Sequence, residues 1–346
     1  MKAFVKTKYG GPEVLRLEEV ELPTLKEDHL FVEVYANAAN PADWHLLRGK
    51  PFFARFTSGL FKPKEKIPGA DFAGVVVAKG SSVANFEVGD HVFGGTLMGG
   101  AFAEYVSVPA SVCARFSKEI SFEQMASLPI AGLTALQALL KHGKLKPGES
   151  VLINGASGGV GHFAVQIARA YGATVTGVCS SRNAEFVQSL GADKVVAYDQ
   201  ENIHLHKGKY DLIIDANGNL THEDFIRMGR RGVLIGFTTM KHMFSILFRK
   251  AFSKFPLIQF TVTVNTADLQ TLATMVDEGK IKPQIEKIFS SSEIPEAIGY
   301  IEAMRTRGKG LVPDDVMAEA TAKLDLPIQD KTMAGRIAAF FKEPRA

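Results

Sequence analysis

The sequence predicts an α/β protein in which a doubly wound parallel sheet is joined to a mostly β domain that forms a partly open barrel. A chain of 346 residues is long for one hydrophobic core and favours two domains. Short strand-like segments separated by turns fill the first part, up to about residue 120. After that point, compact apolar runs alternate with helical patterns, which is typical of a parallel sheet.

The N-terminal part is expected to consist of short strands. Met1–Lys8 and Val14–Leu22 are strand candidates, and the turn cluster Gly10-Gly11-Pro12 separates them. Further strands are predicted where β-branched and aromatic residues recur between turns: Leu30–Ala36, Phe72–Lys79, His91–Phe93 and Phe102–Val108.

Helices and buried strands are expected to alternate from about residue 124 onward. Gln124–Lys141 is rich in Ala and Leu and is predicted to be helical. The apolar runs expected to form the parallel sheet are Val151–Asn154, Thr174–Cys179, Lys194–Ala197, Leu212–Asp215, Val233–Gly236 and Phe260–Val264.

The last part of the chain is predicted to return to the first domain. The segments Pro283–Lys287, Pro295–Arg305 and Gly310–Val312 do not extend the parallel sheet naturally. We therefore assign residues 1–123 and 265–346 to the β-rich domain and residues 124–264 to the doubly wound domain.

Composition excludes several classes of protein. Hydrophobic residues make up 46% and charged residues 22%, as in an ordinary globular protein, and a net charge of +3 without a long basic run gives no reason to expect nucleic acid. Two cysteines cannot form a disulfide framework, and we find no signal peptide or bilayer-spanning stretch. The expected location is cytoplasmic.

A glycine-rich turn is the strongest local signal. The apolar strand Val151–Asn154 enters it, and the amphipathic helix His162–Tyr171 leaves it. This order matches the dinucleotide fingerprint G-x-G-x-x-G, with Ala156 in place of the first glycine. Glycines permit close approach of a pyrophosphate to the helix N-terminus. The expected contacts are Ser157, Gly158, Gly159, Val160 and Gly161.

The end of the next strand indicates which dinucleotide binds. A site for NAD usually has a carboxylate there, to bind the ribose 2′-hydroxyl. This strand is followed by Ser180, Ser181 and Arg182 instead, and two hydroxyls with a guanidinium suit a 2′-phosphate. The sequence therefore favours NADP, and the alternative is that Arg182 is an ordinary solvated residue.

Five motifs together resemble the medium-chain dehydrogenase/reductases, and more narrowly their quinone oxidoreductase branch. They are Ile67–Gly74, Val88–Phe93, Ala131–Ala135, Asn154–Gly161 and Leu190–Asp193, in the order of that family. The resemblance covers roughly residues 1–312 and implies a GroES-like catalytic domain beside a Rossmann domain.

The resemblance also implies a site without zinc. The zinc alcohol dehydrogenases of this family take a Cys, a His and a second Cys as ligands of the catalytic metal. Here Asn40 and Ala70 occupy the first two ligand positions, and Leu128–Thr134 offers no third ligand. His204 and His206 lie in a polar segment and are not expected to bind a metal.

Without a metal, hydride transfer is easier to a conjugated acceptor, and the resemblance implies quinones and α,β-unsaturated carbonyls as substrates. Asn40 is the first candidate for a polar group facing the nicotinamide, although an Asn-Pro turn is the alternative. Thr134 resembles a family threonine near the cofactor, or is a plain interior residue. By resemblance the cofactor cleft is also lined by Tyr198, Asn217, Phe237 and Thr238, and closed by Lys309 and Gly310.

Two other functions are kept open: an enoyl-thioester reductase on the same fold, and a non-catalytic NADPH-binding sensor or interaction protein. The family resemblance implies a homodimer. The segment Met240–Phe260 interleaves basic and apolar residues; membrane contact is considered for it, but a substrate lid or dimer-facing segment is favoured. No role is assigned to the tail from Pro313 to Ala346.

Overall fold

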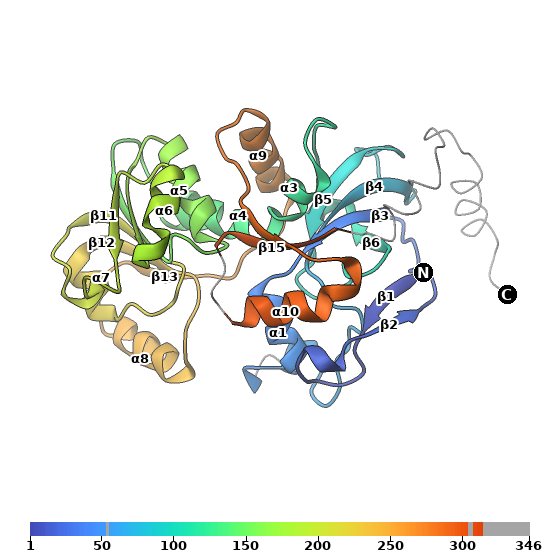
Figure 1. The fold of residues 1–346 in the computed structure, drawn as a ribbon, viewed down its shortest axis with the longest axis horizontal. Helices are drawn as coiled ribbons and strands as arrows, with labels where there is room; N and C mark the ends of the chain where they lie inside the picture. Colours follow the sequence, from blue (N-terminus) through green and yellow to red (C-terminus); the bar gives the residue numbers. More distant parts are fainter. Residues whose placement is uncertain (53–54, 304–306, 314–346) are drawn as a thin grey trace.

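The fold was analysed in a computed structural model that describes residues 1–52, 55–303 and 307–313. Two lobes lie side by side, one around each of two large sheets (Figure 1). The tail to which no role was assigned falls almost entirely outside the described residues. Within the described part of the chain, no helix is long and apolar enough to cross a membrane.

The first lobe contains a six-stranded parallel sheet in the order β10-β9-β8-β11-β12-β13. The chain first adds β9 and β10 on one side of β8 and then adds β11, β12 and β13 on the other side. The order in which strands are added therefore reverses between β8 and β11, although all six strands run parallel. This is the predicted doubly wound sheet. Its strands are β8 (Ser150–Asn154), β9 (Thr174–Cys179), β10 (Lys194–Ala197), β11 (Tyr210–Asp215), β12 (Gly229–Leu234) and β13 (Leu257–Gln259).

The sixth strand differs from the prediction. It is formed by Leu257–Gln259, which pairs with β12, whereas Phe260–Val264 lies outside the sheet. That segment keeps alternate side chains on the core, but its backbone pairs with a side chain: the amide of Gln137 donates to the carbonyl of Thr263 (2.7 Å) and accepts from its N–H (3.0 Å). The alternation of apolar residues therefore reflects burial of every second side chain, but the segment is a linker packed on the core and not a strand of the sheet.

The predicted helix over Gln124–Lys141 is divided. It consists of α3 (Phe122–Ala126), α4 (Pro129–Leu136) and a π-helical turn (Gln137–His142). Pro129 has no N–H to continue the preceding turn and is favourable at a helix start, so it begins a new helix. The other helices of this lobe are α5 (Gly161–Ala170), α6 (Ala184–Ser189), α7 (His222–Met228) and α8 (Met240–Ala251).

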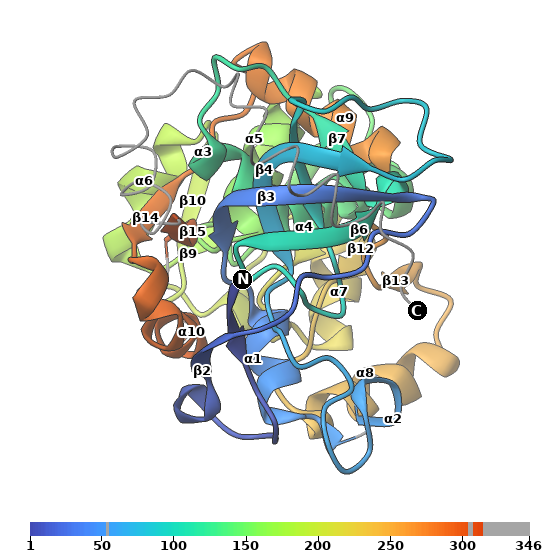
Figure 2. The ribbon, with the colours of Figure 1, turned by 90° about the vertical axis from the view of Figure 1, so that its right-hand side faces the viewer.

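The second lobe contains a seven-stranded sheet in the order β14-β15-β3-β4-β5-β7, with β6 also paired to β3. Residues from both ends of the chain form it, because β15 pairs antiparallel with β3, bringing Leu311 opposite Ala38 (Figure 2). Residues 285–313 thus lie in the same sheet as strands from the first part of the chain. These strands are β3 (His29–Ala38), β4 (Asp71–Lys79), β5 (His91–Gly95), β6 (Tyr105–Pro109), β7 (Cys113–Arg115), β14 (Ile285–Ile288) and β15 (Lys309–Pro313).

Shorter elements complete the second lobe. The ribbon of β1 (Lys2–Val5) and β2 (Arg16–Glu19) lies beside α1 (Pro41–Arg48) and α10 (Ile294–Glu302). Arg48 on α1 makes a bidentate ion pair with Glu302 on α10, at 2.5 and 2.8 Å. The remaining helices are α2 (Arg55–Ser58) and α9 (Thr266–Asp277).

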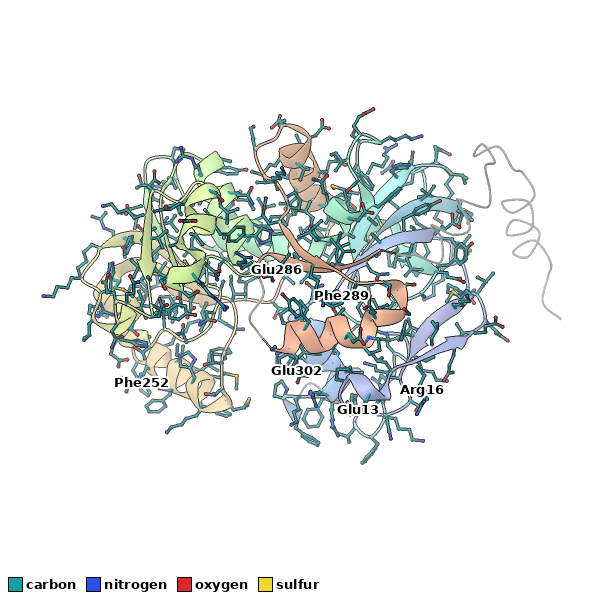
Figure 3. All side chains as sticks on the ribbon, viewed as in Figure 1. Glu13, Arg16, Phe252, Glu286, Phe289 and Glu302 are labelled. Carbon is teal, nitrogen blue, oxygen red and sulfur yellow. The ribbon has the colours of Figure 1, made fainter. Side chains whose placement is uncertain are left out.

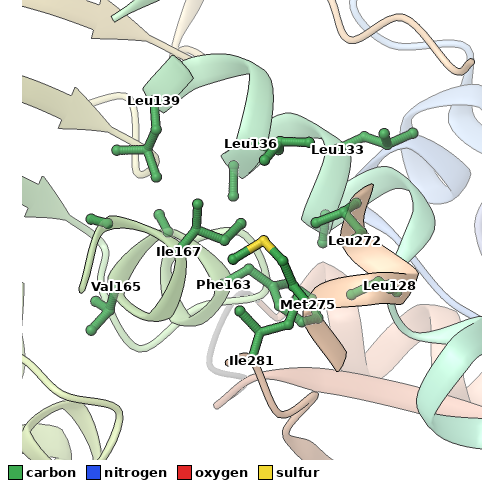
Figure 4. Packing of buried hydrophobic residues seen from close by; sticks show 14 of the residues in the cluster. Leu128, Leu133, Leu136, Leu139, Phe163, Val165, Ile167, Leu272, Met275 and Ile281 are labelled. Carbon is green, nitrogen blue, oxygen red and sulfur yellow. The ribbon is translucent and has the colours of Figure 1, made fainter. Parts of the chain in front are cut away.

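One apolar core joins the two lobes. Helix α4 is buried on all sides and packs against α5 of the first lobe and α9, as Figure 4 shows for Leu133, Phe163 and Leu272. The same cluster includes Phe93 and Leu311 from the second sheet. Burial of the apolar side chains of this cluster is the main favourable contribution to holding the two sheets in fixed positions.

Hydrogen bonds also hold the two lobes to each other. The Gln166 side chain on α5 donates to the carbonyl of Lys282 (3.1 Å) and accepts from its N–H (2.8 Å). The N–H of Gly308 donates to the carbonyl of Ser157 in the glycine-rich turn (2.9 Å). Segments about 120 and 150 residues apart in sequence are thus joined by hydrogen bonds that involve backbone groups.

His162 makes a third contact of this kind. Its Nδ1 lies 3.0 Å from the carbonyl of Gly158, and its Nε2 lies 3.4 Å from the N–H of Gln284. Both contacts are satisfied by the neutral ring with the proton on Nδ1. Burial lowers the pKa of His162 to about 4.

Stability is expected to fall in acid because of this histidine. Between its ordinary pKa of 6.5 and the folded value of about 4, the unfolded chain binds the proton and the folded chain does not. Stability contributed above pH 6.5 is therefore lost as pH decreases, by about 3 kcal/mol in total. Urea unfolding measured from pH 7 to pH 4 should show the free energy of unfolding falling with pH, and His162→Gln should make this dependence on pH less steep. Equal slopes for both proteins would contradict the assignment.

Candidate active site at the junction of the two sheets

The glycine-rich turn follows β8 at the carboxyl edge of the parallel sheet. Gly155 has a φ of 82°, so it supplies the left-handed residue of the turn, one position before the alanine that was aligned with the first glycine of the fingerprint. A β-carbon on Gly161 would lie 2.0 Å from the carbonyl oxygen of Gly155, so only glycine allows this packing. A β-carbon on Gly158 would have its nearest contact at 3.4 Å. The backbone at Gly158 is thus accessible to a ligand.

Residues after β9 form the next part of the edge. Ser181 is already engaged, since its N–H and hydroxyl donate to the Asp199 carboxylate at 2.8 and 2.6 Å. The hydroxyl oxygen of Ser180 is buried and has no hydrogen-bond partner among the described residues. Arg182 and Tyr198 are exposed beside it. Asp199 was not predicted; its only signal in the sequence was its position after the following strand.

A buried carboxylate organises the loop after β11. Asp215 accepts hydrogen bonds from the N–H groups of Gly218 (2.8 Å) and Leu220 (2.9 Å) and from the side chain of Asn154 (2.7 Å). Burial raises its pKa, and these hydrogen bonds oppose that increase. Asn217 follows on this loop, so its position depends on Asp215, which the sequence analysis placed only at a strand end.

The loop after β12 lies against the same edge. Thr238 donates through its N–H (3.1 Å) and its hydroxyl (3.2 Å) to the carbonyl of Gly218. Phe237 precedes it and packs in the first lobe against His242. A β-carbon on Gly155 would lie 3.2 Å from Asn217. The glycine-rich turn, the loop that carries Asn217 and the loop that carries Thr238 therefore lie together along one edge of the sheet.

The second lobe contributes a buried polar cluster. Asn40 precedes α1, and its amide nitrogen donates to the Ala38 carbonyl (3.2 Å) and to Oδ2 of Asp71 (2.9 Å). The ammonium of Lys309 donates to Oδ1 of Asn40 (2.5 Å) and lies 3.4 Å from Oδ2 of Asp71. All three side chains are at most 3% exposed. Both amide hydrogens of Asn40 are thus used within the protein.

Two carboxylates share the positive charge of this cluster. Burial raises the pKa of Asp43 to about 7 and also raises that of Asp71, while Lys309 opposes both increases. Asp43 accepts from the N–H of Asn40 (2.7 Å), which completes a capping box at the start of α1. Neither carboxylate was predicted as a site residue, although Asp71 lies in the motif Ile67–Gly74.

Lys309 connects the two lobes. Its head group lies among residues of the second lobe, and its stem lies against the glycine-rich turn: a β-carbon on Gly159 would be 3.5 Å from Cδ of Lys309. Gly310 follows in β15. Thr134 is buried in α4 and donates to the carbonyl of Ile130 (2.6 Å), so its hydroxyl hydrogen is used within the helix.

The histidine pair that was not expected to bind metal has other partners. His204 lies 2.6 Å from Asp224, and His206 lies 2.6 Å from Glu201 and 2.9 Å from the hydroxyl of Tyr210. Among the residues that the structure describes, no group of three or more His, Cys, Asp or Glu side chains could hold a metal ion.

Comparisons with known proteins agree with this architecture. Residues 26–118 match the family described as alcohol dehydrogenase GroES-like domain, and residues 190–312 match that described as zinc-binding dehydrogenase. The chain is 35% identical to the NADPH-dependent alkenal/one oxidoreductase, chloroplastic, of Arabidopsis thaliana, over 90% of this chain and 79% of that protein.

Solved structures give the same result. The quinone oxidoreductase of Coxiella burnetii has a TM-score of 0.81 and 31% identity, covering 90% of this chain and 99% of that one. The Escherichia coli quinone oxidoreductase complexed with NADPH has a TM-score of 0.75 and 26% identity, covering 90% of this chain and 100% of that one. The chain therefore belongs to the medium-chain dehydrogenase/reductase superfamily, in its quinone oxidoreductase branch.

Proposed function

We propose that the protein is an NADPH-dependent reductase of quinones or α,β-unsaturated carbonyls that works without a metal ion. The observation that carries the proposal is the buried cluster of Asn40, Asp71 and Lys309 beside the glycine-rich turn. Asn40 and Ala70 stand at two positions where zinc relatives have ligands, and an ammonium group is buried next to them. The names of the relatives, alkenal/one and quinone oxidoreductase, support the same substrate class.

The residues present fit the proposed cofactor. The Ser180 hydroxyl oxygen is buried without a partner among the residues that the structure describes, as expected for a group that contacts a ligand. A β-carbon on Gly236 would meet no atom within 4 Å, which leaves the backbone open at this edge. We assign the pyrophosphate to the turn Ser157–Gly161 at the start of α5, and the 2′-phosphate to Ser180, Arg182 and Tyr198. Bound NADPH would supply the hydride.

The hydrogen bonds within the cluster indicate different roles for Asn40 and Lys309. Asn40 has no amide hydrogen left for a substrate, so we infer that it positions Lys309 instead of contacting the reacting atoms. Lys309 has three N–H donors, of which Asn40 and Asp71 receive two. The third is left for the cofactor or for negative charge that develops on a substrate oxygen. A quinone or enone suits this site because it delocalises that charge itself.

The oligomeric state and the compartment stay predictions. The resemblance favours a homodimer, and the sequence favours the cytoplasm, whereas the name of the Arabidopsis relative places that protein in the chloroplast.

The substrate class can be tested by NADPH oxidation with a simple quinone, a small enone, an α,β-unsaturated (enoyl) thioester and a saturated ketone. Turnover of the quinone and the enone, with little on the ketone, is expected, and dialysis against a chelator should leave the rates unchanged. Preference for the thioester would favour the enoyl-thioester alternative, and tight binding without turnover would favour a sensor. Loss of activity in the chelator would contradict the metal-free mechanism.

Arg182→Ala should weaken NADPH binding by about tenfold to a hundredfold, since charged hydrogen bonds contribute about 1.5–3 kcal/mol. NADH has no 2′-phosphate, and its affinity should change little. Fluorescence titration of both nucleotides measures this. Arg230→Ala is the control, because Arg230 is exposed at the opposite end of the strands. Equal losses for both nucleotides would remove the argument for a 2′-phosphate contact.

Lys309→Gln should weaken NADPH and NADH by similar factors, about tenfold, because the Lys309 side chain lies against the turn common to both cofactors. Lys309→Arg should restore part of the affinity. Thermal unfolding distinguishes lost binding from lost folding. A loss confined to NADPH, or no loss in a folded Lys309→Gln protein, would contradict the assigned role.

A further inference from the structure

The exposed phenylalanines are concentrated in two segments. Among the described residues, six phenylalanine side chains are exposed, and all of them lie within residues 52–66 or 240–254. We call the described residues of these two segments (52, 55–66 and 240–254) together the basic aromatic face. Its phenylalanines are Phe52, Phe56, Phe61, Phe244, Phe248 and Phe252. Isolated exposed apolar residues are ordinary, but a cluster of large ones indicates an interaction surface.

Both segments lie at the same end of the molecule, although they come from different lobes. In Figures 1 and 2 the helices α2 and α8 lie along the lower edge, and Figure 2 places them next to each other. Phe252, 80% exposed, projects outward at the end of α8 (Figure 3). Phe61, 87% exposed, lies in the loop that follows α2.

Helix α8 has its apolar side toward solvent. Only Ile246 of its twelve residues is buried, whereas Phe244, Leu247 and Phe248 are exposed. The helix is nonetheless well formed, because the Thr239 side chain caps it by accepting from the N–H of His242. The described residues therefore provide no partner for this apolar surface.

The same two segments carry a strong positive charge. Residues 52–66 and 240–254 contain eight Lys or Arg residues and one acidic residue, Glu65, a net charge of +7. The whole chain carries +3, so the remainder carries −4. Arg249 pairs with Glu223, but six lysines form no ion pair with any described residue: Lys62, Lys64, Lys66, Lys241, Lys250 and Lys254.

We propose that the basic aromatic face docks on the surface of a phospholipid bilayer that contains anionic headgroups. Lysines would contact the headgroups and phenylalanines would enter the boundary with the acyl chains, as in interfacial amphipathic helices. A second copy of the chain is the weaker partner, because an isologous interface would bring two charges of +7 together.

Docking would have a consequence that rests on the proposed function. Apolar quinones and enals dissolve in bilayers, so a docked reductase would meet them at high local concentration. The docking itself does not depend on the reaction, and it can fail or succeed separately.

The test is flotation of the full chain with vesicles of phosphatidylcholine alone and of phosphatidylcholine with an equal part of phosphatidylserine. We expect binding to the anionic vesicles, weak binding to the neutral ones, and release at high salt. The double variant Phe61→Ser/Phe252→Ser should lower the vesicle affinity by about tenfold or more. The charge variant Lys62→Glu/Lys250→Glu should lower it by a similar factor.

Leu205→Ser is the matched control, since Leu205 is 73% exposed on a different part of the first lobe. It should bind vesicles as the unmodified protein does, and thermal unfolding should show that all variants fold. Three results would overturn the proposal: no binding to anionic vesicles at low salt, equal binding to neutral vesicles, or equal effects of the control and the phenylalanine variant. A self-associating protein that ignores vesicles, and dissociates with Phe61→Ser/Phe252→Ser, would also overturn it.

Discussion

The side chain of Lys309 is buried between the two lobes, and an amide and a carboxylate from the N-terminal part of the chain hold its ammonium group. A buried charge is costly unless it is paired and hydrogen-bonded, so this contact requires β15 to lie beside β3 and Asn40 to stand at the start of α1. The same side chain lies along the glycine-rich turn of the first lobe. One interaction therefore links the return of the chain, the position of Asn40 and the site for a dinucleotide.

Buried polar groups set the rest of the site in a similar way. Asp215 holds the loop that carries Asn217, and neutral His162 holds the glycine-rich turn to the returning segment. Each is satisfied by backbone groups from loops, which have no sheet partners of their own. These hydrogen bonds pre-organise the carboxyl edge of the parallel sheet, which reduces the entropy lost when a ligand binds.

Charged and exposed apolar residues are distributed over the surface differently from the way buried residues are distributed in the core. One buried cluster spans both lobes, but positive charge and exposed phenylalanines are concentrated at one end. A net charge of +3 describes the chain poorly, because it is the sum of a basic face and an acidic remainder. Steering toward an anionic surface depends on that distribution more than on the total.

The sequence by itself determined the elements that depend on local pattern. Five of the six parallel strands, the glycine-rich turn and the return of the chain were predicted, because apolar runs, glycines and prolines act over a few residues. It also predicted a strand at Phe260–Val264, where the apolar alternation is real but the backbone pairs with Gln137, a partner distant in sequence.

Only the tertiary structure decided which side chains meet. The sequence named Asn40 and Lys309 separately, and it could not show that they bond, since 269 positions separate them. It did not identify Asp43, Asp71, Asp199 or Asp215 as parts of the site, because a carboxylate in a motif has no distinct pattern until its burial and partners are known. The alignment of segments 52–66 and 240–254 at one end likewise required the packing of the two lobes. Local pattern specifies elements, whereas burial and long-range hydrogen bonds specify a site.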